Sequence, residues 1–157
     1  GVVPDLLTLA KPLAGGLPIG AVLMSERVAA AISPGDHGST FAGAPLVCAA
    51  ANYTVDTVSQ ESFLKNVMEM GERLRDGLQR LAEPRGLTVR GEGLLNGIVF
   101  PDAEGCGAVQ RAAQEESLLV LTAGAGNVLR IAPALNVSAK EIDDALARLE
   151  RAFKAFS

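Results

Sequence analysis

Two segments of the chain place apolar side chains at the three- and four-residue spacing of an amphipathic helix. The first spans residues 63–81, and the second follows Ser138, where Glu141 stands at the spacing of a capping box. Each stripe needs an apolar surface to cover it, and the short apolar runs along the chain are candidate strands. The pattern therefore predicts an α/β or α+β fold, with helices covering a sheet. The two stripes consist of Val67, Met70, Leu74, Leu78 and Leu81, and of Ile142, Ala145, Leu146, Leu149 and Phe153.

The first third of the chain is organised differently, because loops rich in glycine dominate it. Short apolar runs at 5–10 and 19–24 predict strands, and the first of them is expected to be buried. Between them, residues 12–18 read as a loop, and residues 33–44 form a second loop. Ser25 is placed to cap a short helix through residue 32. Pro45 suits the first turn of an alanine-rich helix, which we expect to be buried.

Further along, strands are predicted at 87–90, 94–100, 118–121 and 128–131, with a helix over 108–116. The change from loops to regular elements suggests a division into residues 1–58 and residues 59–157. A helix over about 44–59 is expected to connect the two parts.

Composition excludes several classes of protein. Hydrophobic residues make up 48% of the 157 residues, which is too many for a disordered chain. The formal net charge is −4 and only six residues are aromatic, so a nucleic-acid partner is not expected. No segment reads as a membrane span. Cys48 and Cys106 have no metal or redox spacing, which favours a reducing compartment and no metal.

Three places in the sequence could carry chemistry. Lys11 follows an apolar run and precedes a glycine-containing loop, so it is either a solvated strand-end lysine or a partly desolvated, nucleophilic amine. Ser39 and Thr40 stand beside glycines shortly before a helix, where hydroxyls either bind phosphate or cap the loop locally. Arg130 interrupts an apolar strand, where a buried guanidinium would need an anion. Its alternatives are a structural ion pair or a place on an edge strand.

These three places together resemble the class III aminotransferases, which use pyridoxal 5'-phosphate. Residues 9–21, LAKPLAGGLPIGA, look like that family's lysine segment, and residues 37–46, HGSTFAGAPL, resemble its phosphate-contacting loop. Residues 129–135, LRIAPAL, resemble its late arginine segment. The three motifs occur in family order. Pro12, Ala14 and Ala134 depart from common family residues, but only by small or loop changes.

The resemblance implies a role for each matching residue. Lys11 would bind the cofactor covalently and move a proton during the reaction, and Thr40 would bind the cofactor phosphate of a neighbouring subunit in a homodimer. Ser39 would lie beside the substrate, and Arg130 would bind a substrate carboxylate. The fold implied is the C-terminal portion of a fold-type I transferase: residues 1–58 from the large cofactor-binding domain and residues 59–157 as the small α/β domain.

Within the family, residues 121–124 and 127–130 are most similar to members that act on N2-acetylornithine. Residues 11–51 resemble the form of those members found in plant and algal organelles. Members that act on ornithine or 4-aminobutyrate are the close alternative. The chain starts without Met, and the family's other cofactor-binding residues lie upstream of the lysine, so we expect a piece of a longer protein. An inert truncated product is therefore a further alternative. The expected compartment is the mitochondrial matrix or plastid stroma in a eukaryote, and otherwise the cytoplasm.

Overall fold

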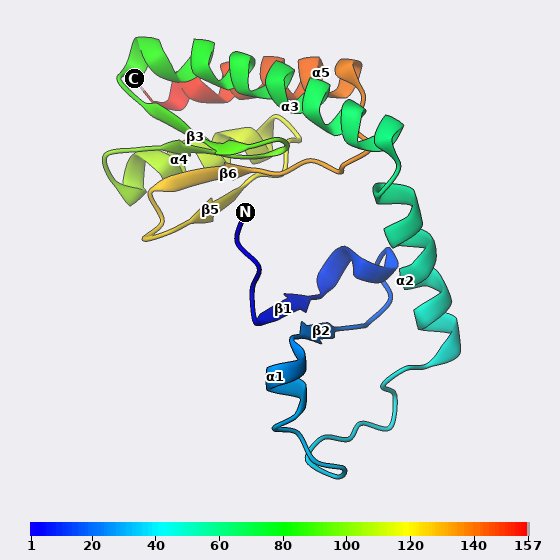
Figure 1. Cartoon of the computed structure of the whole chain (residues 1–157). Coiled ribbons are helices and arrows are strands. Elements are labelled where there is room, and N and C mark those ends of the chain that lie inside the picture. The colour runs from blue at the N-terminus through cyan, green and yellow to red at the C-terminus, as the bar shows by residue number, and fades with distance from the viewer. Residues whose placement is uncertain (157) are drawn as a thin grey trace. The chain divides into compact units, whose positions relative to one another are not determined.

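The computed structural model describes residues 1–156, and its internal contacts divide the chain into two compact units that meet between Gln60 and Glu61 (Figure 1). The first unit, residues 1–60, contains β1 (Leu6–Leu9), the 3-10 helix η1 (Lys11–Ala14), β2 (Ala21–Met24), α1 (Glu26–Ala29) and α2 (Pro45–Val58). The second unit contains α3 (Glu61–Ala82), η2 (Glu83–Arg85), β3 (Thr88–Glu92), β4 (Leu95–Val99), α4 (Ala103–Glu115), β5 (Leu121–Ala123), β6 (Val128–Ile131), α5 (Ala139–Ala152) and η3 (Phe153–Ala155).

In the first unit, β1 and β2 pair antiparallel, with Leu6 opposite Met24 and Leu9 opposite Ala21. Asp5 ties α1 to the start of this ribbon, because its carboxylate accepts from Ser25 Oγ at 3.2 Å and pairs with Arg27 at 2.8 Å. Ser25 occupies the expected N-cap position, but its hydroxyl makes no cap hydrogen bond.

Two expectations about burial in this unit are wrong. Both faces of β1 are exposed, and α2 buries only Ala51, although Pro45 does begin that helix as expected. The unit is described in full, and its only other buried hydrophobic residue is Ala14, on η1, which packs against α2. The apolar residues of β1 and α2 lack a covering surface within these 60 residues, so their pattern predicted the elements correctly but not their burial.

The second unit is built on a four-stranded antiparallel sheet in the order β3-β4-β6-β5. Helix α3 packs on β3 and β4, α4 packs on β5 and β6, and α5 lies alongside α3 and α4 (Figure 1). The apolar stripes predicted for α3 and α5 face the core between helices and sheet, where Leu78, Leu149 and Phe153 are fully or almost fully buried. The predicted α/β fold is confirmed in this unit.

Local signals explain most of the element ends. The capping box at the start of α5 is present, with Ser138 Oγ accepting from the Glu141 backbone N–H and the Glu141 carboxylate accepting from the Ser138 backbone N–H. α4 begins at Ala103, five residues earlier than predicted, because Asp102 caps it by accepting from Gly105 N at 2.8 Å. Strand β5 covers 121–123 rather than 118–121.

Helix α3 approaches the turn between β3 and β4 unusually closely. A Cβ built on Gly71 would lie 2.7 Å from the backbone carbon of Gly93, well inside van der Waals contact. Buried Asn96 also holds this turn, donating from Nδ2 to the Gly93 carbonyl at 2.8 Å. The β3–β4 hairpin is therefore fixed directly against α3.

Candidate active site

Lys11 lies at the junction between β1 and η1 and has an unusual backbone. Its φ is +52°, and among the described residues only one other non-glycine residue, Ser117, has a positive φ. A left-handed conformation at a residue with a Cβ costs about 1–3 kcal/mol and is concentrated at functional sites. Residues 12–18, predicted as a loop, are partly a 3-10 helix: η1 begins at Lys11 and ends at Ala14.

The side chain of Lys11 is exposed, so among the described residues it matches the first of its two alternatives, a solvated lysine at a strand end, and not a partly desolvated amine. Its amine makes no hydrogen bond or ion pair with any of them. The chain then passes through Gly15 and Gly16, and a Cβ on Gly16 would meet nothing within 4 Å. The amine therefore has no partner among the described residues, and open space lies beside Gly16.

The loop containing Ser39 folds back toward the segment that follows the lysine. A cavity of about 520 Å³ is lined by Ser39, Phe41 and Gly43 from that loop and by residues 18–21 before and at the start of β2. Thr40 is exposed and does not line this cavity. Among the described residues, the hydroxyls of Ser39 and Thr40 make no hydrogen bond, so the alternative of a locally capped loop is not observed.

Arg130 lies on β6 between buried Leu129 and Ile131, but its own side chain is exposed on the opposite face of the sheet. The expectation of a buried guanidinium is therefore wrong. Its two structural alternatives are not observed either. β6 lies between β4 and β5, so it is not an edge strand, and Arg130 makes no ion pair with any described residue. Its guanidinium remains available to an external anion.

The predicted site residues are divided between the units, with Lys11, Ser39 and Thr40 in the first and Arg130 in the second. The structure brings Ser39 next to the segment after Lys11.

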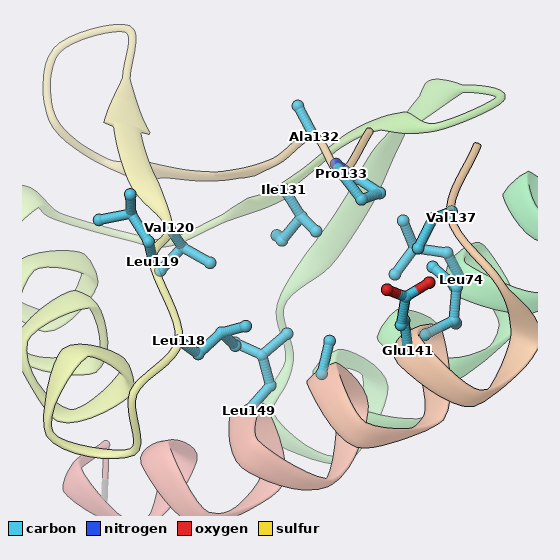
Figure 2. A pocket seen from close by; sticks show the side chains of 12 residues that line it. Leu74, Leu118, Leu119, Val120, Ile131, Ala132, Pro133, Val137, Glu141 and Leu149 are labelled. Carbon is cyan, nitrogen blue, oxygen red and sulfur yellow. The ribbon is translucent and has the colours of Figure 1, made fainter. Parts of the chain in front are cut away.

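The second unit also contains an apolar cavity of about 180 Å³ between its helices and the sheet (Figure 2). Leu74, Leu149 and Ile131 point into it from α3, α5 and β6, and the only carboxylate on its wall is that of Glu141. Hydrogen bonds from Ser138 lower the pKa of Glu141, because they stabilise the charged carboxylate. That carboxylate serves the helix cap, and none of the predicted site residues lines the cavity.

Two further observations concern metals and membranes. Within residues 1–156, no group of three or more His, Cys, Asp or Glu side chains is arranged to hold a metal ion. No helix in the described part of the chain combines the length and the apolar character needed to cross a bilayer.

The chain is similar to known aminotransferases over almost its entire length. A curated relative, the mitochondrial acetylornithine aminotransferase of Alnus glutinosa, is 49% identical over 146 residues, covering 92% of this chain and 32% of the relative. The crystal structure of N-acetylornithine aminotransferase from Stenotrophomonas maltophilia superimposes with a TM-score of 0.84 at 38% identity, covering 99% of this chain and 41% of that one.

A second solved structure, the ornithine aminotransferase of Toxoplasma gondii, gives a TM-score of 0.86 at 33% identity, covering 99% of this chain and 37% of that one. Pyridoxal phosphate partially occupies the active site of that protein. The chain spans about a third of the length of the first curated relatives it matches. Residues 1–153 match the family described as aminotransferase class-III. The chain therefore belongs to the class III aminotransferases, a family of pyridoxal-phosphate-dependent enzymes that act on amino acids and keto acids.

Proposed function

We propose that this chain is the lysine-bearing part of an enzyme that transfers the amino group of N2-acetylornithine to 2-oxoglutarate. The products are N-acetylglutamate 5-semialdehyde and glutamate, which places the reaction in arginine biosynthesis. The relatives named as acetylornithine aminotransferases support this substrate, with identities of up to 49%. The observation that carries the proposal is Lys11, whose free amine follows a strand in a left-handed conformation beside glycines.

Each chain residue has one task in this proposal. The amine of Lys11 holds the cofactor and then moves a proton at the substrate carbon that carries the amino group. Thr40 donates to the cofactor phosphate across the interface of a homodimer, and Ser39 lines the substrate side of the cavity beside residues 18–21. Arg130 binds a substrate carboxylate through its planar fork. Bound pyridoxal phosphate supplies the electron sink for the reaction.

The residues present fit the cofactor, because they offer an amine for its aldehyde and hydroxyls for its phosphate. The amine of Lys11 and the hydroxyls of Ser39 and Thr40 have no partners among the described residues, as expected of groups kept for a ligand.

We assign residues 1–58 to the end of the large cofactor-binding domain and residues 59–157 to the small domain. We further propose a location in the mitochondrial matrix or plastid stroma in a eukaryote, or in the cytoplasm otherwise.

Ornithine is the second candidate substrate, because an ornithine aminotransferase structure superimposes with a TM-score of 0.86. The lower sequence identity of 33% makes it the weaker candidate. A direct comparison of the holoenzyme with N2-acetylornithine and with ornithine, each with 2-oxoglutarate, would decide between them. We expect the larger kcat/KM for the acetylated substrate, and a larger value for ornithine would reverse the assignment.

The lysine itself is tested by covalent mapping. The sequence has four lysines, at positions 11, 65, 140 and 154. Borohydride reduction of the holoenzyme, followed by peptide mass spectrometry, should place the cofactor on Lys11. Lys11→Ala should abolish this label and nearly all transamination, and Lys11→Arg should fail equally because a guanidinium stays protonated. Lys65→Arg is the matched control and should retain both. Label on another lysine alone would contradict the proposal.

A further inference from the structure

The strand register places Arg90 on the same face of the sheet as Arg130. Gly97 of β4 lies opposite Arg90 of β3 on one side and opposite Arg130 of β6 on the other. Directly opposed residues in antiparallel strands project to the same face. Because neighbouring strands lie about 4.8 Å apart, the two arginine backbones are roughly 10 Å apart. Gly97, between them, has no side chain, so nothing in this row separates the two guanidinium groups.

This face of the sheet is the open one within its unit. Ile98 and Leu129, one position along the strands, are fully buried on the other face, which α3 and α4 cover. Arg90 and Arg130 are exposed and line a single shallow depression of about 440 Å³. Leu95, Ala123 and Val128 complete its apolar floor. Two cations therefore project over an apolar surface.

Neither guanidinium has a partner among the described residues, although six of the ten arginines in the sequence do. Glu92 lies on the same face and lines the same depression, yet it forms no ion pair with Arg90. The arginines with partners are Arg27, Arg73, Arg75, Arg85, Arg148 and Arg151. Two like charges in one row of the sheet repel one another, and an anion between them offsets that repulsion.

We propose that Arg90 is a second carboxylate-binding residue and that it shares with Arg130 a single substrate carboxylate held above Gly97. Each guanidinium donates two N–H groups from a planar fork, so two forks converging on one carboxylate satisfy both of its oxygens from two directions. This inference deepens the proposed function, because it concerns the carboxylate that Arg130 binds there. It does not depend on the cofactor, since both residues and the intervening glycine belong to one unit.

The test is a ¹H–¹⁵N NMR titration of the 157-residue chain, without cofactor, using 2-oxoglutarate as the probe. We expect the Gly97 amide to shift on binding. Arg90→Gln and Arg130→Gln should each raise the dissociation constant about tenfold or more, the scale of a charge-assisted hydrogen bond. The control is Arg111→Gln, an exposed arginine on α4, which should leave the dissociation constant within twofold. All variants lie on exposed positions, and their spectra report whether the fold is retained.

The double variant tests whether one carboxylate is shared. If both arginines hold the same carboxylate, the dissociation constant of the double variant should rise by much less than the product of the increases in the two single variants. An increase equal to that product would show two independent sites and would overturn the shared carboxylate. An Arg90→Gln result equal to that of Arg111→Gln would overturn the role of Arg90 altogether. Equal displacement of the probe by sulfate at the same concentration would mean an unspecific anion surface and would also overturn the proposal.

These outcomes are separable from those of the proposed function. Correct labelling of Lys11 together with an unaffected Arg90→Gln titration would remove only the present inference. Non-additive losses of 2-oxoglutarate affinity in the Arg90 and Arg130 variants, together with no label on Lys11, would remove the proposed function and leave the arginine pair.

Discussion

The two units differ sharply in how much of their own surface they bury. Residues from 61 onward form a core in which Leu74, Leu78, Ile98 and Leu129 are at most 1% exposed. The first 60 residues bury only two small side chains, Ala14 and Ala51, and leave Leu7 of β1 45% exposed. Yet three of the four predicted site residues lie in this poorly buried unit. Stability is thus concentrated in one unit and the predicted covalent chemistry in the other.

The glycines show the same contrast. In the first unit, a Cβ added at Gly16, Gly35, Gly38 or Gly43 would meet nothing within 4 Å. In the second unit, a Cβ added at Gly77 would lie 2.2 Å from Leu146. Glycine therefore leaves space around these four loop positions of the first unit, whereas at Gly71 and Gly77 it permits close packing against Gly93 and Leu146.

The largest expected difference in stability comes from truncating a leucine to alanine in each unit. Leu78→Ala should destabilise the second unit by about 2–5 kcal/mol, because it removes fully buried methyl groups and leaves a cavity. Leu7→Ala should change stability by less than about 0.5 kcal/mol, since the side chain is already half exposed. Urea denaturation followed by circular dichroism measures both. A loss for Leu7→Ala as large as that for Leu78→Ala would show that β1 is covered in solution.

An intermediate effect is expected at the glycines. Gly71→Ala should destabilise by about 1–3 kcal/mol despite the better helix propensity of alanine, because the new methyl group meets the backbone of Gly93. Gly38→Ala should be nearly neutral. Gly107→Ala, in α4, is the helical control: its nearest atom is the flexible end of Arg111 at 3.3 Å, so it should stabilise slightly. Thermal melting of the three variants ranks them, and a neutral Gly71→Ala would contradict the close approach of α3 to the hairpin.

The smallest effect should come from the ion pair that joins α3 to α5. Arg73 donates from Nε and Nη2 to the two carboxylate oxygens of Asp143, both at 2.7 Å. These bonds lower the pKa of Asp143, so the folded state binds that proton less readily than the unfolded state does. The pair therefore stabilises the fold above the ordinary aspartate pKa of about 3.9, and its contribution is lost as pH falls through the lowered folded pKa.

Asp143→Asn should accordingly lower the melting temperature slightly near pH 7 and should have progressively less effect below pH 4. Asp76→Asn, at an exposed position of α3 that makes no ion pair with any described residue, is the control and should leave the melting temperature near pH 7 almost unchanged. Melting curves between pH 3 and 7 measure the difference. A pH-independent loss in Asp143→Asn would mean that the ion pair does not set the stability of the α3–α5 contact.

Much of the second unit could be predicted from the sequence, because its signals are local and periodic. The stripe from Val67 to Leu81 predicted the buried face of α3, and Ser138 with Glu141 predicted the start of α5. The ends of helices and strands were predicted less accurately where a single side chain decides them. Asp102 begins α4 before any apolar periodicity is visible, and β5 begins later than its apolar run.

The candidate site was predicted only where one residue stands inside a recognisable motif. Lys11, Ser39, Thr40 and Arg130 were proposed in this way, and their roles stay predictions. Arg90 was not singled out, because its relation to Arg130 runs through Gly97 and depends on the pairing of three strands. The signal that could have found it is the antiparallel register, which aligns these three residues in one row.

The sequence alone determined most of the elements, the apolar stripes of the second unit and the family to which the chain belongs, because these depend on residue identities and spacings within short stretches of the chain. Only the tertiary structure decided which apolar residues are covered, which face Arg130 occupies and which side chains stand beside it. Burial and side-by-side placement depend on partners distant in sequence. Apolar residues are therefore core in α3, where the sheet lies against them, and surface in β1, where the first unit supplies no cover.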